Sequence, residues 1–392
     1  MGKPGIAIVG LRGIPSQYGG TETFVEELVI RLKDNFQFYV MHEDKQFSED
    51  KYQGVIRVHS PAVESKSTSI PSINDFLNTA YMLAKHEKEI DLFYFLGPDS
   101  SIAAILGRLA GKRILINPDG VEWRRLIKRS RFVPFHLFPV YLSTMVYMYF
   151  MEYLSCKLPD VVVADSLGIK EHLTKRHKPR RIVYIAYGAR ELLPSKLSKK
   201  EEAEILSRFE LEPHGYYLTV ARIVAENNIH IEIEGFKKAD SPKKLVIVGN
   251  FNRKDPYSRH LFKLAEDDEN IVLLDPIYDK GVLGILRKNC FAYIHAYEVG
   301  GTNPSLLEQM LFKRPILAYD VPFNREVLRE GGIYFKDAED LVGKMGMLER
   351  GEFDLRLIKK TQVKRIKRQY NWEKVAREYE RVFKSLIRGH RE

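Results

Sequence analysis

The stretch Phe291-Ala-Tyr-Ile-His-Ala-Tyr-Glu-Val-Gly-Gly-Thr-Asn-Pro-Ser-Leu-Leu-Glu308 decides how the second half of the chain folds. It opens with an apolar and aromatic run of the kind that forms a buried strand. Gly300 and Gly301 then free the backbone, and Pro304 suits the first turn of a helix. A strand that leads through a glycine loop into a helix is typical of doubly wound α/β domains, in which ligands bind at the carboxyl ends of the strands.

The same alternation of short apolar runs and helical stretches extends along the whole chain. Strands are predicted at 216–220, 244–248, 270–274, 291–295 and 315–318, and in the first half at 5–9, 36–41, 55–59, 92–96, 113–117, 161–164 and 181–185. Continuous apolar strands separated by helices indicate parallel sheets that are covered on both faces. We therefore predict an α/β fold of two doubly wound, Rossmann-like domains facing each other across a cleft, with a polar boundary region at 188–214.

The loop at 296–303 is a candidate diphosphate site. Its glycines let backbone amides approach a ligand, and the following helix N-terminus attracts an anion. Glu308, one turn inside the helix, would offer a carboxylate to ribose hydroxyls. The alternative is that Glu308 favours the helix dipole or pairs with Lys313.

Two further loops follow predicted strands. Arg222 stands at the carboxyl end of the strand at 216–220, and arginine suits bidentate phosphate recognition. The loop from Gly10 to Gly20 leads directly into a helix and suggests a cradle for a phosphate or a sugar. It matches neither the dinucleotide nor the Walker spacing of glycines, so an ordinary strand-to-helix turn and an exposed loop arginine remain the alternatives.

Asp119 follows the strand at 113–117 in the sequence Asn117-Pro-Asp-Gly-Val-Glu-Trp123. A carboxylate at this edge could orient or deprotonate an acceptor hydroxyl, and so could Glu122. The alternative is an Asp-Gly turn.

Composition and charge exclude several classes. The chain has 392 residues, a formal charge of +10 and two cysteines far apart, so a disulfide scaffold and a cysteine zinc cluster are excluded. The charge suggests anionic partners, but no RNA-binding or zinc-finger motif accompanies it, so no nucleic acid is expected. The start of the chain lacks an apolar run of signal-peptide length, so a cytoplasmic location is expected.

No metal or cofactor is expected. No two aspartates stand two positions apart, His42-Glu43-Asp44 has no second histidine at ligand spacing, and His136, His172 and His177 have no partner in the sequence.

Residues 132–151 contain no Asp, Glu, Lys or Arg, and basic residues at 124–131 precede them. Two prolines and several tyrosines argue against a membrane span. The alternatives left open are a core helix and an interfacial helix lying on anionic lipid.

Taken as a set, five segments resemble the retaining, nucleotide-sugar-dependent glycosyltransferases of family four, which have the GT-B fold, and more narrowly their rhamnosyltransferase-like subgroup. The resemblance covers nearly the whole chain. The segments are Gly13-Ile-Pro-Ser-Gln-Tyr-Gly-Gly-Thr-Glu-Thr-Phe24, Asp119-Gly-Val-Glu-Trp123, Ala164-Asp-Ser166, Arg222 with Glu226-Asn-Asn-Ile229, and Val299-Gly-Gly-Thr-Asn-Pro-Ser-Leu306 with Glu308.

The resemblance implies an acceptor-side domain at 1–190, a nucleotide-sugar-binding domain at 191–370, and a last helix at 371–392 that crosses back to the first domain. Arg222 would bind the diphosphate and Glu308 the ribose. The implied catalytic residues are Asp119, Glu122 and Arg222, and the implied donor-binding residues are Gly19, Gly20, Arg222, Asn227, Asn228, Glu298, Gly300, Gly301, Thr302, Asn303 and Glu308.

The chain departs from the family pattern at two positions. The family has a lysine six residues after the arginine, where this chain has Asn228, and a glutamate eight residues before the second glutamate, where it has Gly300. Whether Glu298 replaces the missing glutamate is left open.

The implied activity is transfer of a sugar, rhamnose as the first choice, from a dTDP-, UDP- or GDP-linked donor to a saccharide hydroxyl with retention. A lipid-linked acceptor and peripheral contact with the inner face of an anionic membrane go with the interfacial helix. The alternatives are a sugar-nucleotide epimerase and a non-enzymatic protein that binds nucleic acid or anionic lipid.

Overall fold

The computed structural model describes residues 2–16, 19–61, 71–189 and 198–391. The chain divides into two compact units. The first unit comprises Met1–Trp123, Val140–Gly188 and Asn371–Glu392, and the second comprises Arg124–Pro139 and Ala189–Tyr370.

In the described residues, the first unit is built on an eight-stranded sheet of order β3-β4-β2-β1-β5-β6-β7-β8. Neighbouring strands are parallel, except that β3 and β4 form an antiparallel pair at one edge. The strands are β1 Gly5–Val9, β2 Gln37–Asp44, β3 Ser48–Tyr52, β4 Val55–Pro61, β5 Ile90–Leu96, β6 Arg113–Asn117, β7 Val161–Ala164 and β8 Ile182–Tyr184. The helices are α1 Gly20–Leu32, α2 Pro71–His86, α3 Ser101–Leu109, α5 Phe138–Lys157, α6 Leu167–His177 and α15 Trp372–Arg391.

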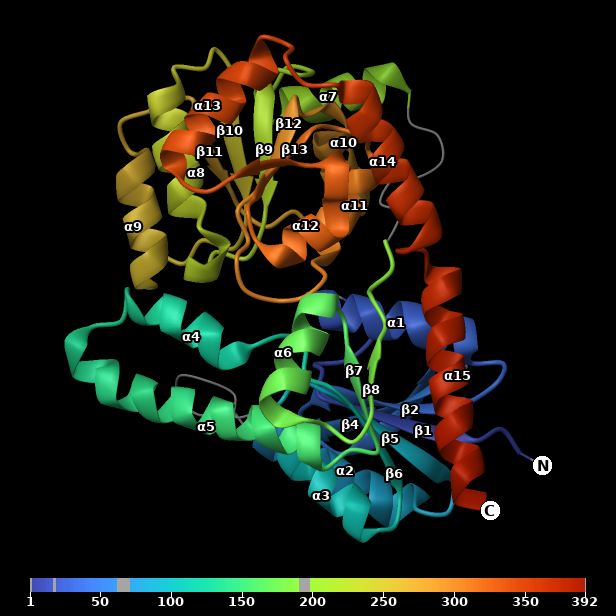
Figure 1. Ribbon diagram of the computed structural model, residues 1–392. Coiled ribbons are helices and arrows are strands. Elements are labelled where there is room, and N and C mark those ends of the chain that lie inside the picture. The colour runs from blue at the N-terminus through green and yellow to red at the C-terminus, as the bar shows by residue number, and fades with distance from the viewer. Residues whose placement is uncertain (1, 17–18, 62–70, 190–197, 392) are drawn as a thin grey trace. The chain divides into compact units, whose positions relative to one another are not determined.

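The second unit has a parallel six-stranded sheet of order β11-β10-β9-β12-β13-β14 in the part of the chain described. Its strands are β9 Tyr216–Val220, β10 Lys244–Val248, β11 Ile271–Leu274, β12 Ala292–His295, β13 Ile316–Tyr319 and β14 Ile333–Phe335. Its helices are α7 Lys199–Ser207, α8 Ile229–Ala239, α9 Pro256–Ala265, α10 Lys280–Asn289, α11 Pro304–Leu311, α12 Pro322–Leu328, α13 Ala338–Glu349 and α14 Leu355–Arg368, with short 3-10 turns η1 Phe135–Leu137, η2 Ala225–Asn227 and η3 Arg329–Gly331. The expected fold class of two doubly wound α/β domains is confirmed (Figure 1).

Strand β5 shows how each sheet buries both of its faces. Successive side chains of a strand point to opposite faces. The ring of Phe93 lies 3.3 Å from where a Cβ would stand on Gly107 of α3, whereas the hydroxyl of Tyr94 lies 2.9 Å from the hydroxyl of Tyr379 on α15. All three aromatic side chains are fully buried. Helices α3 and α15 therefore cover opposite faces of the first sheet.

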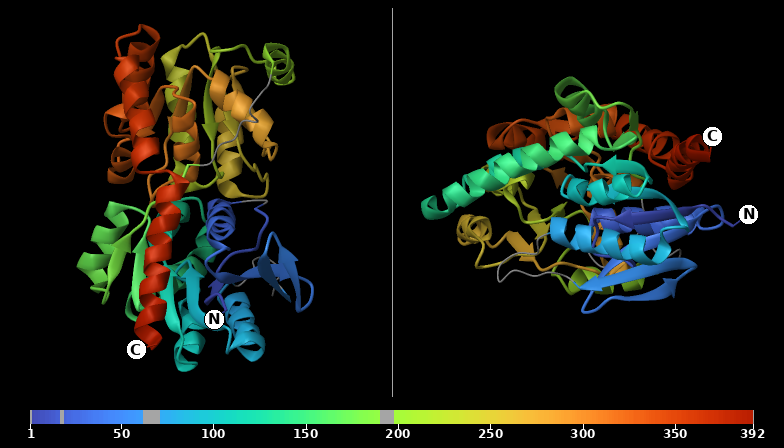
Figure 2. Two further views of the ribbon diagram at one scale, coloured as in Figure 1. Left: turned by 90° about the vertical axis from the view of Figure 1, so that its right-hand side faces the viewer. Right: turned by 90° about the horizontal axis from the view of Figure 1, so that it is seen from below.

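Helix α15 belongs to the first unit although it follows the whole second unit in the chain, and Figure 2 shows it as the red helix that ends at the C-terminus. Its apolar spacing places aromatic rings against α1. The ring of Phe24 lies 5.3 Å from that of Tyr379 and 6.0 Å from that of Trp372. Burial of this stripe holds the last helix on the first unit.

One segment clusters differently from the boundary expected from the sequence. Helix α4 (Glu122–Ser130) starts in the first unit, but Arg124–Pro139 clusters with the second. The reason is a set of ion pairs and ring contacts between this segment and the rest of the second unit. Phe132, for example, packs on the ring of Tyr257 at 4.8 Å.

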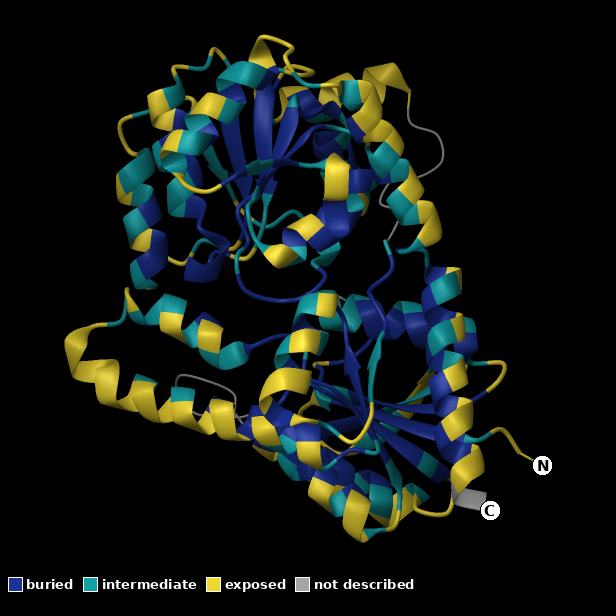
Figure 3. Ribbon diagram, viewed as in Figure 1, coloured by how far each residue is buried: buried dark blue, intermediate teal, exposed yellow. Residues whose placement is uncertain are grey.

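Helix α5 is the least covered helix of the first unit, and most of it is coloured as exposed in Figure 3. Its buried residues, such as Met148, Met151 and Glu152, lie in its C-terminal half. Among the described residues, no helix combines the length and apolarity that crossing a bilayer would require.

Candidate functional site

The candidate site of the second unit lies at the carboxyl ends of β9 and β12. These strands are neighbours in the sheet, with Tyr293 opposite Leu218. The loops that follow them therefore meet, and the backbone N–H of Glu298 donates a 3.0 Å hydrogen bond to the carbonyl of Glu226. The donor-binding residues predicted between 222 and 228 and between 298 and 308 lie on these two loops and on α11, which follows the second.

Local sequence caps the N-terminus of α11 at this edge. The side chain of Asn303 caps the helix by accepting a 2.9 Å hydrogen bond from the N–H of Ser305, and Pro304 occupies the first turn. Thr302 is buried beside them. The positive end of a helix dipole favours an anionic ligand beside it.

Gly300 stands where the family pattern has a glutamate, and its surroundings leave little room for a side chain. Its φ is +154°, and a Cβ built there would stand 1.7 Å from the hydroxyl of Tyr297 and 2.9 Å from a guanidinium nitrogen of Arg125. A side chain at this position is excluded unless Tyr297 moves.

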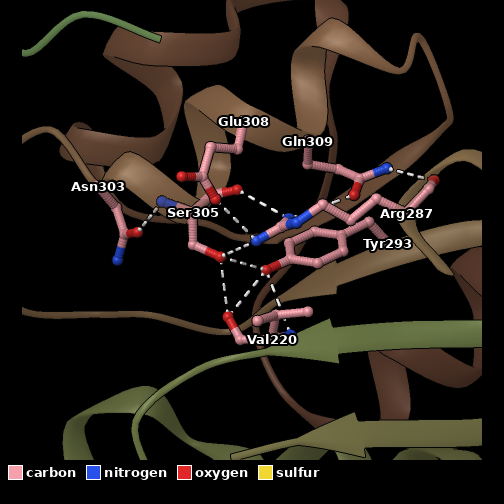
Figure 4. A network of polar contacts seen from close by, with 7 residues as sticks. All are labelled: Val220, Arg287, Tyr293, Asn303, Ser305, Glu308 and Gln309. Carbon is pink, nitrogen blue, oxygen red and sulfur yellow. Dashed lines mark hydrogen bonds and ion pairs between the residues drawn. The ribbon is translucent and has the colours of Figure 1, made fainter. Parts of the chain in front are cut away.

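Behind α11 lies a buried cation that the sequence reasoning missed. Arg287 of α10 has a side chain only 1% exposed, and it donates to Ser305 Oγ at 2.7 Å and to Glu308 Oε2 at 3.1 Å (Figure 4). It also donates to the carbonyl of Ser305 and to Gln309 Oε1. Glu308 therefore has an ion-pair partner, Arg287, that the sequence reasoning did not consider. No loop motif marks Arg287, because it lies on a helix eighteen residues before Ser305.

The same network reaches the end of β9. The hydroxyls of Tyr293 and Ser305 lie 3.0 and 2.9 Å from the carbonyl oxygen of Val220, and 2.9 Å from each other. Figure 4 shows these contacts below the guanidinium of Arg287. The start of α11 is thus fixed to the strand that precedes Arg222.

Asn228 and Glu298 lie together. Asn228 has a φ of +50° at the start of α8, and its side-chain amide donates to Glu298 Oε2 at 3.0 Å. Glu298 Oε1 lies 2.7 Å from Nζ of Lys128 on α4. Where the family pattern has a lysine, this chain therefore has an amide beside a Glu–Lys ion pair.

Residues of α4 make two more polar contacts with this edge of the second unit. Arg129 forms a bidentate ion pair with Glu226, which is fully buried, and Arg125 donates to the carbonyl of Val299 and to the hydroxyl of Tyr297. Three basic residues of the run at 124–131, Arg125, Lys128 and Arg129, therefore make contacts within the second unit. A linear motif does not reveal such pairing.

Arg222 itself is exposed, and its backbone carbonyl accepts a 2.6 Å hydrogen bond from the side chain of Asn227. Asn227 therefore orders the backbone from which the arginine projects.

His295, the last residue of β12, is buried, and burial lowers the pKa of its imidazole to about 3. His295 is a neutral group directly before the loop, and the sequence reasoning did not single it out.

In the first unit, Asp119 adopts a φ of +50° and is followed by Gly120 at +109°, so it does form a tight turn after β6. Its Oδ1 accepts a 2.7 Å hydrogen bond from the hydroxyl of Tyr187. The pKa of Glu22 at the start of α1 is raised by burial and, to a lesser degree, by the charge of Asp119. Although Asp119 lies in a turn, its carboxylate stays near the start of α1, which follows the loop with Gly19.

Gly19 has a φ of +109° and directly precedes α1, which begins at Gly20. Gln17 and Tyr18 of this loop lie outside the described residues.

Further carboxyl groups near this edge were missed by the sequence reasoning. Burial, with a contribution from the charge of Glu122, raises the pKa of Asp99 to about 6, and burial raises that of Asp75 to about 7. Ser100 Oγ lies 2.6 Å from Asp75 Oδ2 and 2.7 Å from the carbonyl of Leu96. The hydrogen bond that the Ser100 hydroxyl donates to Asp75 lowers the pKa of this carboxyl, but burial outweighs it.

The statement that His172 and His177 lack partners is wrong. Both donate to one oxygen of Glu152, at 3.0 and 2.7 Å, a contact between two helices that sequence spacing cannot reveal.

Comparison with known proteins finds two family matches. Residues 4–190 match a family described as "Domain of unknown function (DUF1972)", and residues 201–372 match the family "Glycosyl transferases group 1". No curated protein matches the chain in sequence.

Several solved structures share the fold of this chain at low sequence identity. Sucrose-phosphate synthase from Thermosynechococcus elongatus has a TM-score of 0.77 at 15% identity, over 99% of this chain and 100% of that one. HepE from Anabaena in complex with UDP-glucose has a TM-score of 0.72 at 14% identity, over 97% and 99%. A glycosyltransferase from Rickettsia africae has a TM-score of 0.71 at 16% identity, over 99% of both chains. Residues 201–372 of this two-domain α/β chain are therefore a glycosyl transferases group 1 domain, carried on the GT-B fold.

Proposed function

We propose that the chain is a retaining glycosyltransferase that moves a sugar from a nucleotide diphosphate donor to a saccharide hydroxyl. The observation that carries the proposal is the edge of the second unit where Arg222 and the capped start of α11, with Glu308, follow neighbouring strands. The loop before the helix would offer amides to a diphosphate, Arg222 would offer a guanidinium, and Glu308 would offer a carboxylate to ribose hydroxyls.

The donor would be a dTDP-, UDP- or GDP-linked sugar. HepE, whose fold this chain shares, is described in complex with UDP-glucose, which favours UDP, whereas the subgroup resemblance favours rhamnose on dTDP. Arg222 and the amides at Gly301, Thr302 and Asn303 would stabilise the departing diphosphate, so the reaction needs no metal and no cofactor. Asp119 and Glu122 of the first unit would orient the acceptor hydroxyl.

Donor affinity tests this assignment. Arg222→Ala and Glu308→Ala should each weaken binding of the preferred nucleotide diphosphate by about 10- to 100-fold, because each removes a charged hydrogen-bonding group. The nucleotide is found first by thermal shift with a panel of nucleotide diphosphates and their sugars without added metal, and its Kd is then measured by calorimetry.

Arg208→Ala is the matched control, since Arg208 is an exposed arginine at the end of α7 in the same unit. Unchanged affinity in both site variants would overturn the donor site. Hydrolysis of the donor without transfer to any saccharide would favour the epimerase alternative.

We further propose that the acceptor is lipid-linked and that the protein is cytoplasmic and peripheral on the inner face of a membrane. The support is the exposed apolar surface of α5, where Val140, Leu142, Val146 and Phe150 are each at least half exposed. Lys157 at its end contacts the carbonyl of Lys178, which brings the exposed basic end of α6 to this helix. An apolar helix beside lysines suits an anionic lipid surface.

Membrane binding is tested with vesicles. The protein should sediment with vesicles that contain phosphatidylglycerol, bind less in high salt, and lose binding in Val146→Glu and Phe150→Glu. Leu109→Glu is the control, because Leu109 is an isolated apolar residue at the end of α3, 80% exposed. Equal sedimentation of the protein with neutral and with anionic vesicles would contradict the proposal. So would α5 variants that sediment with anionic vesicles as fully as the unmodified chain does.

A further inference from the structure

We propose that Glu152, His172 and His177 form a binding site for one divalent transition-metal ion, with zinc as the first choice. Glu152 lies on α5, and the two histidines lie on α6. The proposal is independent of the glycosyltransferase assignment, because all three residues belong to the first unit and none is among the donor or acceptor residues above.

The donor set converges on one point. Nε2 of His172 and Nε2 of His177 lie 3.0 and 2.7 Å from the same oxygen, Oε1 of Glu152, and the three ligand atoms all lie within 4.8 Å of one another. Ligand atoms around a tetrahedral zinc with bonds of about 2.0 to 2.1 Å are about 3.3 Å apart. A lengthening of about 0.3 Å for His172 and about 0.6 Å for His177 would therefore bring each nitrogen to this distance from the oxygen.

The chemistry of the donors fits zinc. Two imidazole nitrogens and one carboxylate oxygen form a borderline donor set that suits zinc and other late first-row ions rather than magnesium or calcium.

A second group orients the carboxylate. The indole Nε1 of Trp123 donates a 3.0 Å hydrogen bond to Oε2, the oxygen that the histidines do not contact. Such a donor is the usual outer partner of a metal-bound carboxylate. Aromatic rings also flank His177, with Tyr149 at 6.0 Å and Tyr153 at 5.9 Å. Glu152 and His177 are 2% and 4% exposed, so two of the three ligands are almost fully buried beside these rings.

The place of the cluster gives the metal a structural role. Helix α5 exposes its N-terminal half, and Glu152 lies where the helix becomes buried against the rest of the unit. A metal bound there would join α5 to α6 and fix Trp123, which ends the Asp119-to-Trp123 segment. The ion would therefore set the direction in which the apolar surface of α5 projects.

The test uses the full chain after removal of metal with a chelator. One equivalent of Co²⁺ should give visible absorption bands typical of a tetrahedral site, Zn²⁺ should abolish them, and Zn²⁺ should raise the thermal midpoint. Glu152→Gln, which is nearly the same shape, and His177→Asn should each weaken Co²⁺ binding by at least about tenfold. His136→Asn, at an exposed histidine of η1, should bind as the unmodified chain does.

Absence of Co²⁺ bands from the unmodified chain, or bands that persist in both Glu152→Gln and His177→Asn, would overturn the proposal. Circular dichroism of the metal-free variants shows whether they fold, and Trp123→Phe provides a second measurement that leaves all three ligands in place. It should bind Co²⁺ more weakly while keeping the shape of the bands. Nucleotide affinity in these variants should be unchanged, so failure of this site and failure of the donor site are distinguishable.

Discussion

Replacing Arg129 with alanine should lower the free energy of unfolding of the second unit by about 3 to 5 kcal/mol. The carboxylate of Glu226 is fully buried, and both of its oxygens accept hydrogen bonds from the Arg129 guanidinium. Without the arginine, an ionised group would remain in the interior with no cation beside it. That cost exceeds the modest gain that ion pairs contribute at a surface.

The measurement must report on the second unit alone. Both tryptophans of the chain lie in the first unit, so fluorescence would follow the wrong part of the molecule. Hydrogen exchange of peptides that cover β9 and β12 should instead show loss of protection in Arg129→Ala. Arg131→Ala, at an exposed arginine two positions further on, should cost less than about 0.5 kcal/mol. An effect of Arg129→Ala no larger than this control would contradict the role given to the ion pair.

Further variants test whether Arg129 and Glu226 act as a coupled pair. Glu226→Gln should cost less than Arg129→Ala, because an uncharged amide can stay buried with an imperfect partner. Combining the two changes should recover part of the loss, since no unpaired carboxylate then remains. Such coupling would show that Arg129 and Glu226 stabilise the second unit as a pair.

The parts of the fold that could be predicted from the sequence are those that local composition controls. The central strands β6, β7, β9 and β10 match the predicted bounds, because a strand buried on both faces must be apolar along its whole length. Strand β3, Ser48–Tyr52, was missed because it pairs at an edge and its residues are polar. Strand β14 was missed because three residues carry too little pattern.

In the candidate site too, some residues could be predicted from local sequence and others could not. The loops with Arg222, Gly300 and Asn303 follow recognisable strands, so their positions at the sheet edge could be predicted. Arg287 and Arg129 could not, because each lies on a helix whose surface pattern looks ordinary, and the acid it pairs with is distant in sequence. The three residues proposed to bind metal escaped for the same reason.

Replacing Arg287 with methionine should produce the largest combined effect, a loss of about 3 to 5 kcal/mol of stability and of most donor binding. Methionine fills a similar length of space but leaves the carboxylate of Glu308 and the hydroxyl of Ser305 without their charged donor. The start of α11, which these contacts hold against Val220, would then lose its fixed position.

Lys288→Met is the matched control at the next position. Nζ of Lys288 lies 2.6 Å from a carboxylate oxygen of Glu202, but 44% of its side chain is exposed, so the change should cost less than about 1 kcal/mol and leave donor binding intact. Stability is followed by hydrogen exchange of peptides that cover α10 and α11, and donor binding by calorimetry.

A double change separates the two roles of Arg287. Arg287→Met with Glu308→Leu replaces a buried ion pair by apolar groups, so stability should recover toward that of the unmodified chain. Donor binding should remain lost, because the carboxylate proposed to hold the ribose is gone. Recovery of both would mean that Glu308 serves only as the partner of Arg287, and recovery of neither would mean that the guanidinium is needed for its contacts with Ser305 and Gln309.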